Sequence, residues 1–268
     1  MTAEMEKRKR MAVFSGSSNL ELADKIAQEL GISLGNVKLE KFANGEIYAR
    51  YLESVRGADV FIVQSVCSSP NGFDVNDNLI AIDLHQDAIQ GFFDKPVNHM
   101  TAMPIFVDYF KQMGFKPEEL CVVSPDVGRA KAAKKFSTLL DCDIAIMHKD
   151  RPKHNQAEIT ALIGDVKDKI CILNDDMIDT AGSLVAAATT LKAKGAKKIY
   201  ACATHGLFSG PAYERLENSC IEEVVVTDAV PVPLERQTGK IKVVTLAPLF
   251  AQTIKNVYNN GSVASLFE

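Results

Sequence analysis

Short runs of apolar, β-favouring residues alternate along this chain with longer segments whose apolar residues recur at helical spacing. Continuous apolar runs bounded by turn residues suit strands that are buried on both faces, and the longer segments suit helices that cover them. The sequence therefore predicts an α/β fold in which parallel sheets are flanked by helices. The expected strands are 12–16, 60–66, 121–126, 144–147, 169–175, 198–206 and 222–228, and the expected helices are 20–30, 130–140, 183–195, 211–218 and 248–258.

Three stretches interrupt this alternation. Residues 67–78 are rich in turn-forming residues and residues 149–158 are polar, so both are expected to be loops. The segment 94–104 breaks the pattern again, which places the main domain boundary near Met100. The expected domains are residues 1–100, with residues 251–268 packing back on them, and residues 101–250.

Composition excludes several classes of protein. The chain has 268 residues, 47% of them hydrophobic and 24% charged, which suits a globular protein with a substantial core. A formal net charge of -4 with only short basic runs gives no electrostatic case for nucleic acid. No apolar run reaches the roughly 18 residues that would cross a membrane. The six cysteines form no CxxC pair, so we expect buried thiols in a reducing, cytoplasmic setting.

The segment NDDMIDTAGS, residues 174–183, carries the chemistry of this sequence. It follows an apolar strand, and α/β proteins bind ligands at the carboxyl ends of such strands. Asp175, Asp176 and Asp179 can accept hydrogen bonds from sugar hydroxyls or bind a divalent cation. The turn after them offers backbone N–H groups at a helix N-terminus, which favours a phosphate. An acidic N-cap followed by a glycine turn is the alternative, but it leaves the adjacent acids unexplained. The residues of this turn are Thr180, Ala181, Gly182 and Ser183.

Together with five other segments, this one resembles the ribose-phosphate pyrophosphokinase family, which has the type I phosphoribosyltransferase fold. The match covers nearly the whole chain in the family's order, and the set is far more specific than the DTAG turn alone. The resemblance implies two similar parallel-sheet domains. The five segments are FSGSSNLELA (14–23), KFANGEIYARYLESVRGADVFIVQS (41–65), IDLHQDAIQGFFDKPV (82–97), VVSPDVGRAKAAKKF (122–136) and ATHGLFSGPAYERL (203–216).

The resemblance implies an enzyme of nucleotide biosynthesis. Such an enzyme transfers the β,γ-diphosphoryl group of ATP to the C1 hydroxyl of ribose 5-phosphate, with Mg²⁺ required, and gives phosphoribosyl pyrophosphate and AMP. Family members assemble into dimers and hexamers, so a homo-oligomer is expected, with neither nucleic acid nor membrane as a partner.

Site roles carry over from the family to the matching residues. The three acids and the turn that follows them would bind ribose 5-phosphate, with help from Arg151. Lys149 and Arg151 match a catalytic loop whose positive charges suit a phosphoryl-transfer transition state. His85 and Asp126 resemble ligands of the Mg²⁺ that accompanies ATP. The short ATP-contacting segment matches Asn44, Gly45 and Glu46.

The resemblance fails at one place. After a segment like 76–79 the family usually continues with roughly 50 residues that carry a strand and an arginine-rich ATP clamp, but here Leu79 runs directly into Ile80. We therefore expect a truncated first domain. Two other functions stay open: a non-catalytic ribose-phosphate-binding paralogue or regulatory subunit, and an ordinary phosphoribosyltransferase. The latter would share residues 174–183 but neither the loop 149–155 nor the N-terminal half.

Overall fold

The computed structural model describes residues 9–42, 47–66, 79–153, 156–237 and 239–266. The chain divides into two compact units: unit 1 comprises Met1–Gly72 and Thr245–Glu268, and unit 2 comprises Phe73–Val244. The division lies earlier than the position near Met100 that the sequence pattern favours. The reason is that the segment after residue 82 is held to the body of unit 2, where the Thr204 hydroxyl donates a hydrogen bond to Asp83 at 2.6 Å.

Unit 2 is built on a seven-stranded sheet with the order β13–β12–β11–β10–β7–β8–β9, in which only the β8–β9 pair is antiparallel. All five residues of β7 are buried, as expected for a parallel strand covered on both faces. The α/β fold with a parallel sheet is therefore confirmed. The strands are β7 (Leu120–Ser124), β8 (Asp143–Lys153), β9 (Gln156–Ile163), β10 (Ile170–Ile178), β11 (Lys198–Gly206), β12 (Glu223–Thr227) and β13 (Ile241–Val244).

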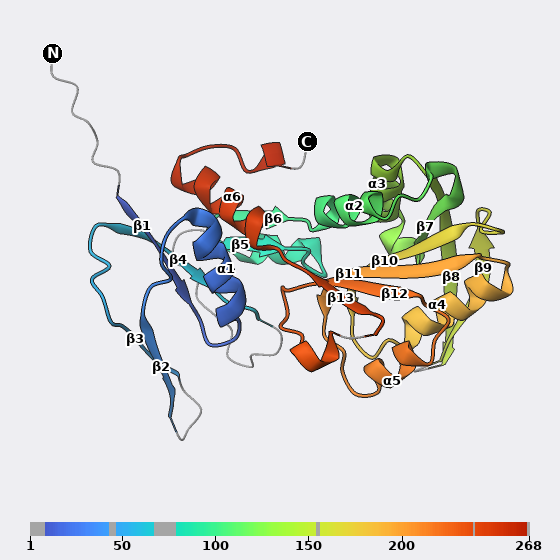
Figure 1. Cartoon of the computed structure of the whole chain (residues 1–268), viewed down its shortest axis with the longest axis horizontal. Helices are drawn as coiled ribbons and strands as arrows, with labels where there is room; N and C mark the ends of the chain where they lie inside the picture. Colours follow the sequence, from blue (N-terminus) through green and yellow to red (C-terminus); the bar gives the residue numbers. More distant parts are fainter. Residues whose placement is uncertain (1–8, 43–46, 67–78, 154–155, 238, 267–268) are drawn as a thin grey trace, which may run out of the picture. The chain divides into compact units, whose positions relative to one another are not determined.

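Helices cover both faces of this sheet, with α2 and α3 on one face and α4 and α5 on the other (Figure 1). The α3 helix follows from its apolar spacing, because Ala133, Phe136 and Leu140 recur every three or four residues and are all buried. It ends at Asp141, which adopts a left-handed conformation with φ 54°. The helices are α2 (Met103–Gln112), α3 (Ala130–Leu140), α4 (Gly182–Ala193) and α5 (Ala212–Glu217), with 3-10 turns η2 (Pro117–Glu119), η3 (Val127–Arg129) and η4 (Leu234–Arg236).

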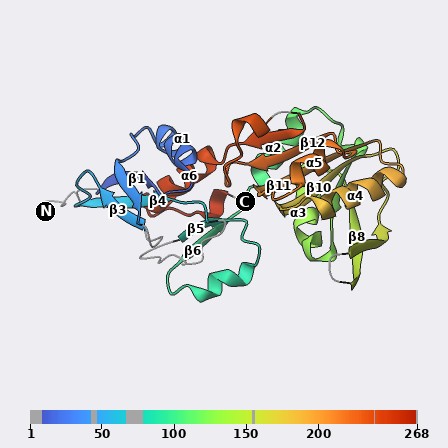
Figure 2. The same cartoon turned by 90° about the horizontal axis from the view of Figure 1, so that it is seen from below.

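Unit 2 also holds a separate two-stranded parallel sheet. Its strands, β5 (Leu79–Ile82) and β6 (Val97–Met100), are connected through the 3-10 helix η1 (Asp87–Phe92) (Figure 2). A backbone hydrogen bond from Asp83 N to Met100 O at 2.9 Å extends this pairing beyond the strands. The chain that leaves β5 leads directly to His85.

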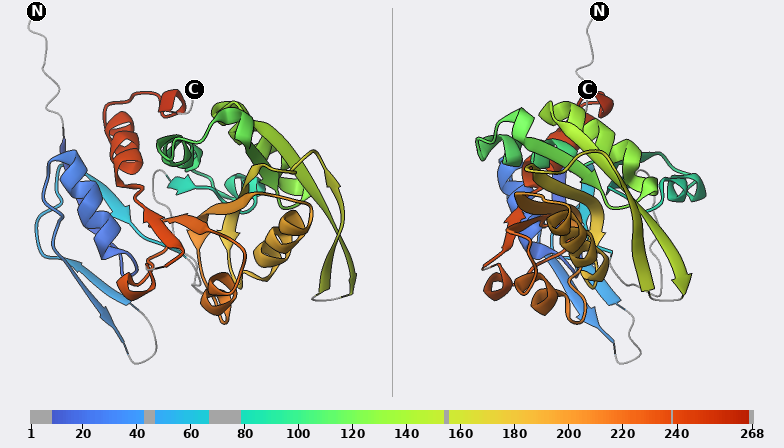
Figure 3. Two further views of the ribbon diagram at one scale, coloured as in Figure 1. Left: turned by 45° about the vertical axis from the view of Figure 1, so that its right-hand side comes forward. Right: turned by 90° about the vertical axis from the view of Figure 1, so that its right-hand side faces the viewer.

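The sequence predicts a loop over residues 149–158, but the described backbone of this segment forms parts of two strands. The β8 strand runs through Lys153 and pairs with β9 as an antiparallel hairpin at the edge of the sheet (Figure 3). The register shifts between Asp150 and Lys153, and such an irregularity accommodates Pro152, which cannot donate a ladder hydrogen bond. Residues 154–155 lie outside the described residues, as does the expected loop 67–78.

Unit 1 is smaller, and its described residues form two small sheets. In one of them β1 pairs with β4 in parallel, and in the other β2 and β3 form an antiparallel hairpin that the apolar pattern does not predict. The α1 helix packs against β1 and against α6. The elements are β1 (Arg10–Ser15), α1 (Leu20–Leu30), β2 (Val37–Lys41), β3 (Ile47–Tyr51), β4 (Ala58–Val63), α6 (Ala247–Tyr258) and the 3-10 turn η5 (Ala264–Leu266).

The β1–β4 pair is incompletely covered. Val13 and Phe14 of β1 are buried, but Val60 and Ile62 of β4 keep 37% and 61% of their surface exposed. Parallel strands are normally buried on both faces, and two strands alone rarely form a stable sheet. This arrangement agrees with a first domain that lacks a strand.

The cysteines that the structure describes are free thiols, and Cys121, Cys171 and Cys202 are buried. Burial raises the pKa of Cys202 to about 12 and that of Cys142 to about 11, so both stay protonated at neutral pH. Cys67 lies outside the described residues. In the part of the chain that the structure covers, no helix is both long and apolar enough to span a membrane.

Candidate active site

The candidate site lies where the strand order of unit 2 reverses. From β7 the chain moves to β8 on one side, whereas from β10 it moves to β11 on the other, and β7 and β10 are neighbours. The carboxyl ends of two such strands open a crevice in which α/β proteins bind ligands. Asp126 follows β7, Asp175 and Asp176 belong to the last residues of β10, and the turn 179–183 follows directly.

The two adjacent acids have different surroundings. The Asp176 side chain is 3% exposed, and its Oδ2 lies 2.7 Å from Nδ1 of His85. The Asp175 side chain is 30% exposed, and its Oδ1 lies 3.8 Å from Nε of Arg129. Asp176 is therefore placed to orient His85, and Asp175 is the more accessible hydrogen-bond acceptor of the pair.

These surroundings separate the pKa values of the pair. Burial raises the pKa of Asp175 to about 7, the adjacent Asp176 adds to this, and Arg129 opposes it. Burial also acts to raise the pKa of Asp176, but hydrogen bonds from His85 and Asp175 and the charge of Arg129 outweigh it, so that pKa is lowered. At neutral pH, Asp176 is ionised and Asp175 can gain or lose a proton.

Asp126 and Arg129 occupy the turn after β7. Asp126 caps η3, and its Oδ1 accepts a hydrogen bond from the Arg129 backbone N–H at 3.1 Å. Within the described residues, Nε of Arg129 is buried and has no hydrogen-bond partner. Arg129 thus joins the turn of Asp126 to the carboxylate of Asp175. The sequence analysis did not select Arg129. The only indication in the sequence is a positive charge three positions after Asp126, a candidate Mg²⁺ ligand.

Asp83 holds the segment that carries His85. It adopts a left-handed conformation with φ 41°, and its Oδ2 accepts hydrogen bonds from Thr204 and from the Ala102 backbone N–H. Its carbonyl oxygen lies 3.0 Å from Nε2 of His205. These contacts fix the end of β5 against β11, next to the strand that carries Asp176. The sequence analysis did not single out Asp83.

The turn 179–183 connects β10 to α4. Ala181 is the N-cap of α4 with φ 58° and makes no side-chain cap hydrogen bond, so the acidic N-cap considered from the sequence is not present. The first N–H groups of α4 have no partner within the helix, and they lie next to the exposed Asp179 and Thr180. This geometry suits a phosphate.

Other expected site residues are placed only in part. The backbones of Lys149 and Arg151 belong to β8, while their side chains lie outside what the structure describes. Asn44, Gly45 and Glu46 lie outside the described residues. Among the residues that are described, no group of three or more His, Cys, Asp or Glu side chains forms a metal cage.

Two family models match this chain. The N-terminal domain of ribose phosphate pyrophosphokinase matches residues 11–113, and the phosphoribosyl synthetase-associated domain matches residues 152–268. A ribose-phosphate pyrophosphokinase of Fusobacterium nucleatum is 42% identical over 312 aligned positions, covering 95% of this chain and 97% of that protein. The chloroplastic ribose-phosphate pyrophosphokinase 2 of Oryza sativa is 38% identical, covering 97% of this chain and 78% of that protein.

A solved structure gives the same result. The crystal structure of phosphoribosylpyrophosphate synthetase from Mycobacterium smegmatis matches with a TM-score of 0.83 and 33% identity, covering 94% of this chain and 100% of that chain. The alignment with the Fusobacterium protein has 312 positions, 44 more than the 268 residues of this chain. Because an alignment counts only positions between its ends, these positions of the relative are internal and have no counterpart here.

Proposed function

Since this chain belongs to the ribose-phosphate pyrophosphokinase family, we propose that it transfers the β,γ-diphosphoryl group of ATP to ribose 5-phosphate, for nucleotide biosynthesis. The C1 hydroxyl oxygen of the sugar forms a bond to the β-phosphorus. The bond between that phosphorus and the oxygen on the α-phosphoryl group breaks, the hydroxyl proton passes to solvent, and AMP leaves. The products are phosphoribosyl pyrophosphate and AMP.

The observation that carries this proposal is the acidic pair next to the turn 179–183, at the point where the strand order reverses. The free N–H groups at the start of α4 would bind the 5-phosphate. The partly buried carboxylate of Asp175 and the exposed carboxylate of Asp179 would accept hydrogen bonds from the ribose hydroxyls. The buried Asp176 would act indirectly, because it is bound to His85.

The residues present fit a divalent cation that arrives with the nucleotide. His85 and Asp126 would hold Mg²⁺, since Nδ1 of His85 is engaged by Asp176 and its 60% exposed side chain leaves the other nitrogen available. Mg²⁺ commonly binds through one or two protein groups plus substrate phosphates, so a cage of three protein ligands is not needed. When bound, it offsets charge on the phosphates.

The transferred group carries negative charge that the chain has to offset as the bonds change. We assign this role to Lys149 and Arg151, because fixed cations contribute most to phosphoryl-type transfer. Arg151 would also contact ribose 5-phosphate. The ATP would be bound by Asn44, Gly45 and Glu46. We further propose a cytoplasmic homo-oligomer, a dimer or a hexamer built from dimers, whose mass light scattering after size-exclusion chromatography would measure.

A second function is favoured by a specific observation. The relative's internal positions without counterpart, and the exposed Val60 and Ile62, support a ribose-phosphate-binding paralogue or regulatory subunit that makes no product. An ordinary phosphoribosyltransferase is disfavoured, because the N-terminal family model matches residues 11–113.

The test is to incubate the purified chain with Mg²⁺, ATP and ribose 5-phosphate and to follow AMP and phosphoribosyl pyrophosphate by ³¹P NMR. Formation of both products supports the transferase. Binding of ribose 5-phosphate in calorimetry without AMP formation supports the non-catalytic paralogue. A chain that neither binds the sugar phosphate nor forms AMP contradicts both.

A further inference from the structure

The side chain of Arg215 reaches the turn 179–183 from a distant part of the sequence. Arg215 lies on α5, and its Nη1 donates a hydrogen bond to the Thr180 carbonyl at 2.9 Å. The same nitrogen would lie 3.2 Å from a Cβ added to Gly182. The guanidinium therefore lies against the first residue of α4, where a side chain larger than that of glycine would make a tight contact with it.

This contact fixes the direction of one peptide plane in the turn. In a trans peptide the carbonyl oxygen and the following N–H point to opposite sides, and the structure contains no cis peptide bond in its described part. Because Arg215 holds the Thr180 carbonyl on one side, the Ala181 N–H points to the other side. Ala181 has a left-handed φ of 58°, a conformation that is uncommon for alanine and needs support from its surroundings.

Arg215 also brings a positive charge to the turn. Of the carboxylates that the structure describes, none forms an ion pair with it, and an arginine has four N–H donors besides the one that Thr180 uses. A positive charge beside a helix N-terminus adds to the attraction that the free N–H groups exert on an anion.

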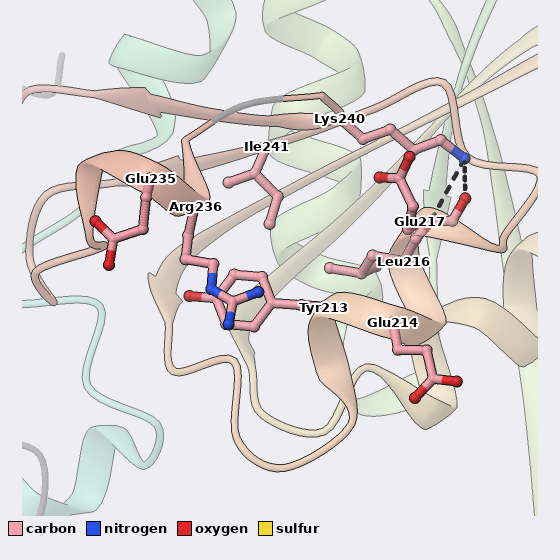
Figure 4. Close-up of a pocket in the computed structure, with 8 residues that line it drawn as sticks. All are labelled: Tyr213, Glu214, Leu216, Glu217, Glu235, Arg236, Lys240 and Ile241. Carbon is pink, nitrogen blue, oxygen red and sulfur yellow. Dashed lines mark hydrogen bonds between the residues drawn. The ribbon is translucent and has the colours of Figure 1, made fainter.

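The opposite side of α5 shows what fixes the helix. Lys240 donates hydrogen bonds to the carbonyls of Leu216, Glu217 and Ser219 at 3.4, 3.0 and 2.7 Å, and Figure 4 shows it reaching the end of the helix. The guanidinium of Arg236 lies 4.7 Å from the ring centroid of Tyr213. Both contacts border a pocket behind α5, and the three Lys240 hydrogen bonds hold the end of the helix that carries Arg215. The pocket is lined by Tyr213, Glu214, Leu216, Glu217, Glu235, Arg236, Lys240 and Ile241.

We propose that Arg215 is a positioning residue for the 5-phosphate of ribose 5-phosphate: it holds the Thr180 carbonyl, directs the Ala181 N–H into the phosphate site and adds positive charge to that site. This inference rests on the proposed function, because it assumes that the turn 179–183 binds a sugar phosphate. It adds to the site a residue that lies 35 positions after Thr180 in the sequence.

The experiment compares wild-type protein with Arg215→Ala, Arg215→Lys and Arg236→Ala by titration calorimetry, using ribose 5-phosphate and inorganic phosphate as ligands. Arg236→Ala is the matched control, because it removes an arginine of η4 that contacts the Tyr213 ring of α5 and has no hydrogen bond to the described turn 179–183. We expect Arg215→Ala to weaken both ligands about tenfold, as for loss of a charge-assisted interaction. Arg215→Lys should restore part of the affinity, to within about threefold of wild type, since it keeps the charge but not the planar fork.

Thermal unfolding of each variant separates binding from stability. The Arg215 side chain is exposed, so the midpoint of unfolding should change little in Arg215→Ala. Wild-type affinity in Arg215→Ala, or an equal loss in Arg236→Ala, would overturn the role of Arg215 while leaving the ribose-phosphate site in place. Wild-type protein that binds neither ligand would overturn the site itself and the inference with it.

Discussion

Asp175 and Asp176 are neighbours in the chain but have different tasks because different groups surround their carboxyls. Asp176 is ionised and holds His85, whereas burial leaves Asp175 with a pKa of about 7. Environments that push two carboxyl pKa values apart are common in active sites. Asp175 accepts hydrogen bonds from a sugar with full strength only when it is ionised.

This difference predicts the pH dependence of binding. The pKa of Asp175 is raised, so its carboxyl is mostly neutral below pH 7 and mostly ionised above it. The affinity for ribose 5-phosphate should therefore increase several-fold from about pH 6 to about pH 8. The phosphate of the ligand titrates in part of the same range, so calorimetry on Asp175→Asn provides the reference. An identical pH profile in wild type and Asp175→Asn would contradict the prediction.

The substitution Asp179→Asn tests the proposed sugar site without changing Asp175 or Asp176. The side chain of Asp179 is exposed beside the turn, and Asp179→Asn removes its charge with little change in shape. Ribose 5-phosphate binding should weaken by about 1–3 kcal/mol in calorimetry, the loss expected for charge-assisted hydrogen bonds. Asp168→Asn is the control, because Asp168 is exposed and its left-handed φ of 59° tolerates asparagine. Equal affinity for Asp179→Asn and wild type would remove Asp179 from the site.

Lys149 is predicted to act on the transition state rather than on bound substrates. In steady-state kinetics, Lys149→Ala should lower kcat on the order of 10²-fold or more with little change in KM. Lys135→Ala, on the exposed surface of α3, should leave both constants unchanged. A raised KM with unchanged kcat would make Lys149 a substrate-binding residue only.

The helices of unit 2 are stabilised mainly by the faces they bury. Phe136 of α3 is fully buried, and its ring centroid lies 6.2 Å from that of Phe110 on α2. Phe136→Ala should lower the free energy of unfolding by about 3–5 kcal/mol in urea titrations, through lost burial and a cavity. The same substitution at Phe92, which is 87% exposed on η1, should cost less than about 0.5 kcal/mol. Equal losses at both positions would contradict this account of the core.

The elements that could be predicted from sequence are those whose burial leaves an apolar pattern. The strands β7 and β10, the helices α1 and α3, and the acidic turn after β10 all carry such a local signal. The β2–β3 hairpin was missed because its residues, such as Lys38 and Glu40, are mostly exposed and charged. The segment 149–158 was taken as a loop because its sequence is polar and contains a proline.

Contacts within the site could not be predicted, because they join residues far apart in the chain. The bond between His85 and Asp176 spans 91 positions, and that between Asp83 and Thr204 spans 121. No local pattern indicates which acid faces which cation. Resemblance to the family supplied His85, whereas Asp83, Arg129 and Arg215 emerge only from the fold.

At the scale of the molecule, this chain lacks internal positions that its relative has. We therefore predict a high KM for ATP. The Fusobacterium relative has at least 44 residues without counterpart here, and the lost segment is expected to include the ATP clamp. The KM for ATP should therefore exceed that of the relative by at least about tenfold, since several charge-assisted phosphate contacts are missing. A chimera that carries the relative's segment between Leu79 and Ile80 should restore it. Equal ATP kinetics for this chain and the relative would show that other residues supply the clamp.

The two units should also differ in stability. Unit 1 has small two-stranded sheets with exposed apolar residues on β4, whereas unit 2 has a seven-stranded sheet covered on both faces. Backbone amides of β1 and β4 should exchange with deuterium at least about tenfold faster than those of β7 and β10. Mass spectrometry of exchanged peptides measures this ratio. Equal protection would show that the β1–β4 pair is covered in solution.

The position of α6 determines when unit 1 can form during synthesis. Its helix packs on α1, yet it is translated after all of unit 2. Domains usually fold as they emerge from the ribosome, starting with the first one made. Here the second unit is complete once residue 244 has emerged, while β1, β4 and α1 wait for Tyr258. A nascent chain halted before α6 would thus carry a folded unit 2 and an incompletely folded unit 1. Between the emergence of residue 244 and that of Tyr258, the apolar residues of unit 1 would be the part of the chain that chaperones bind.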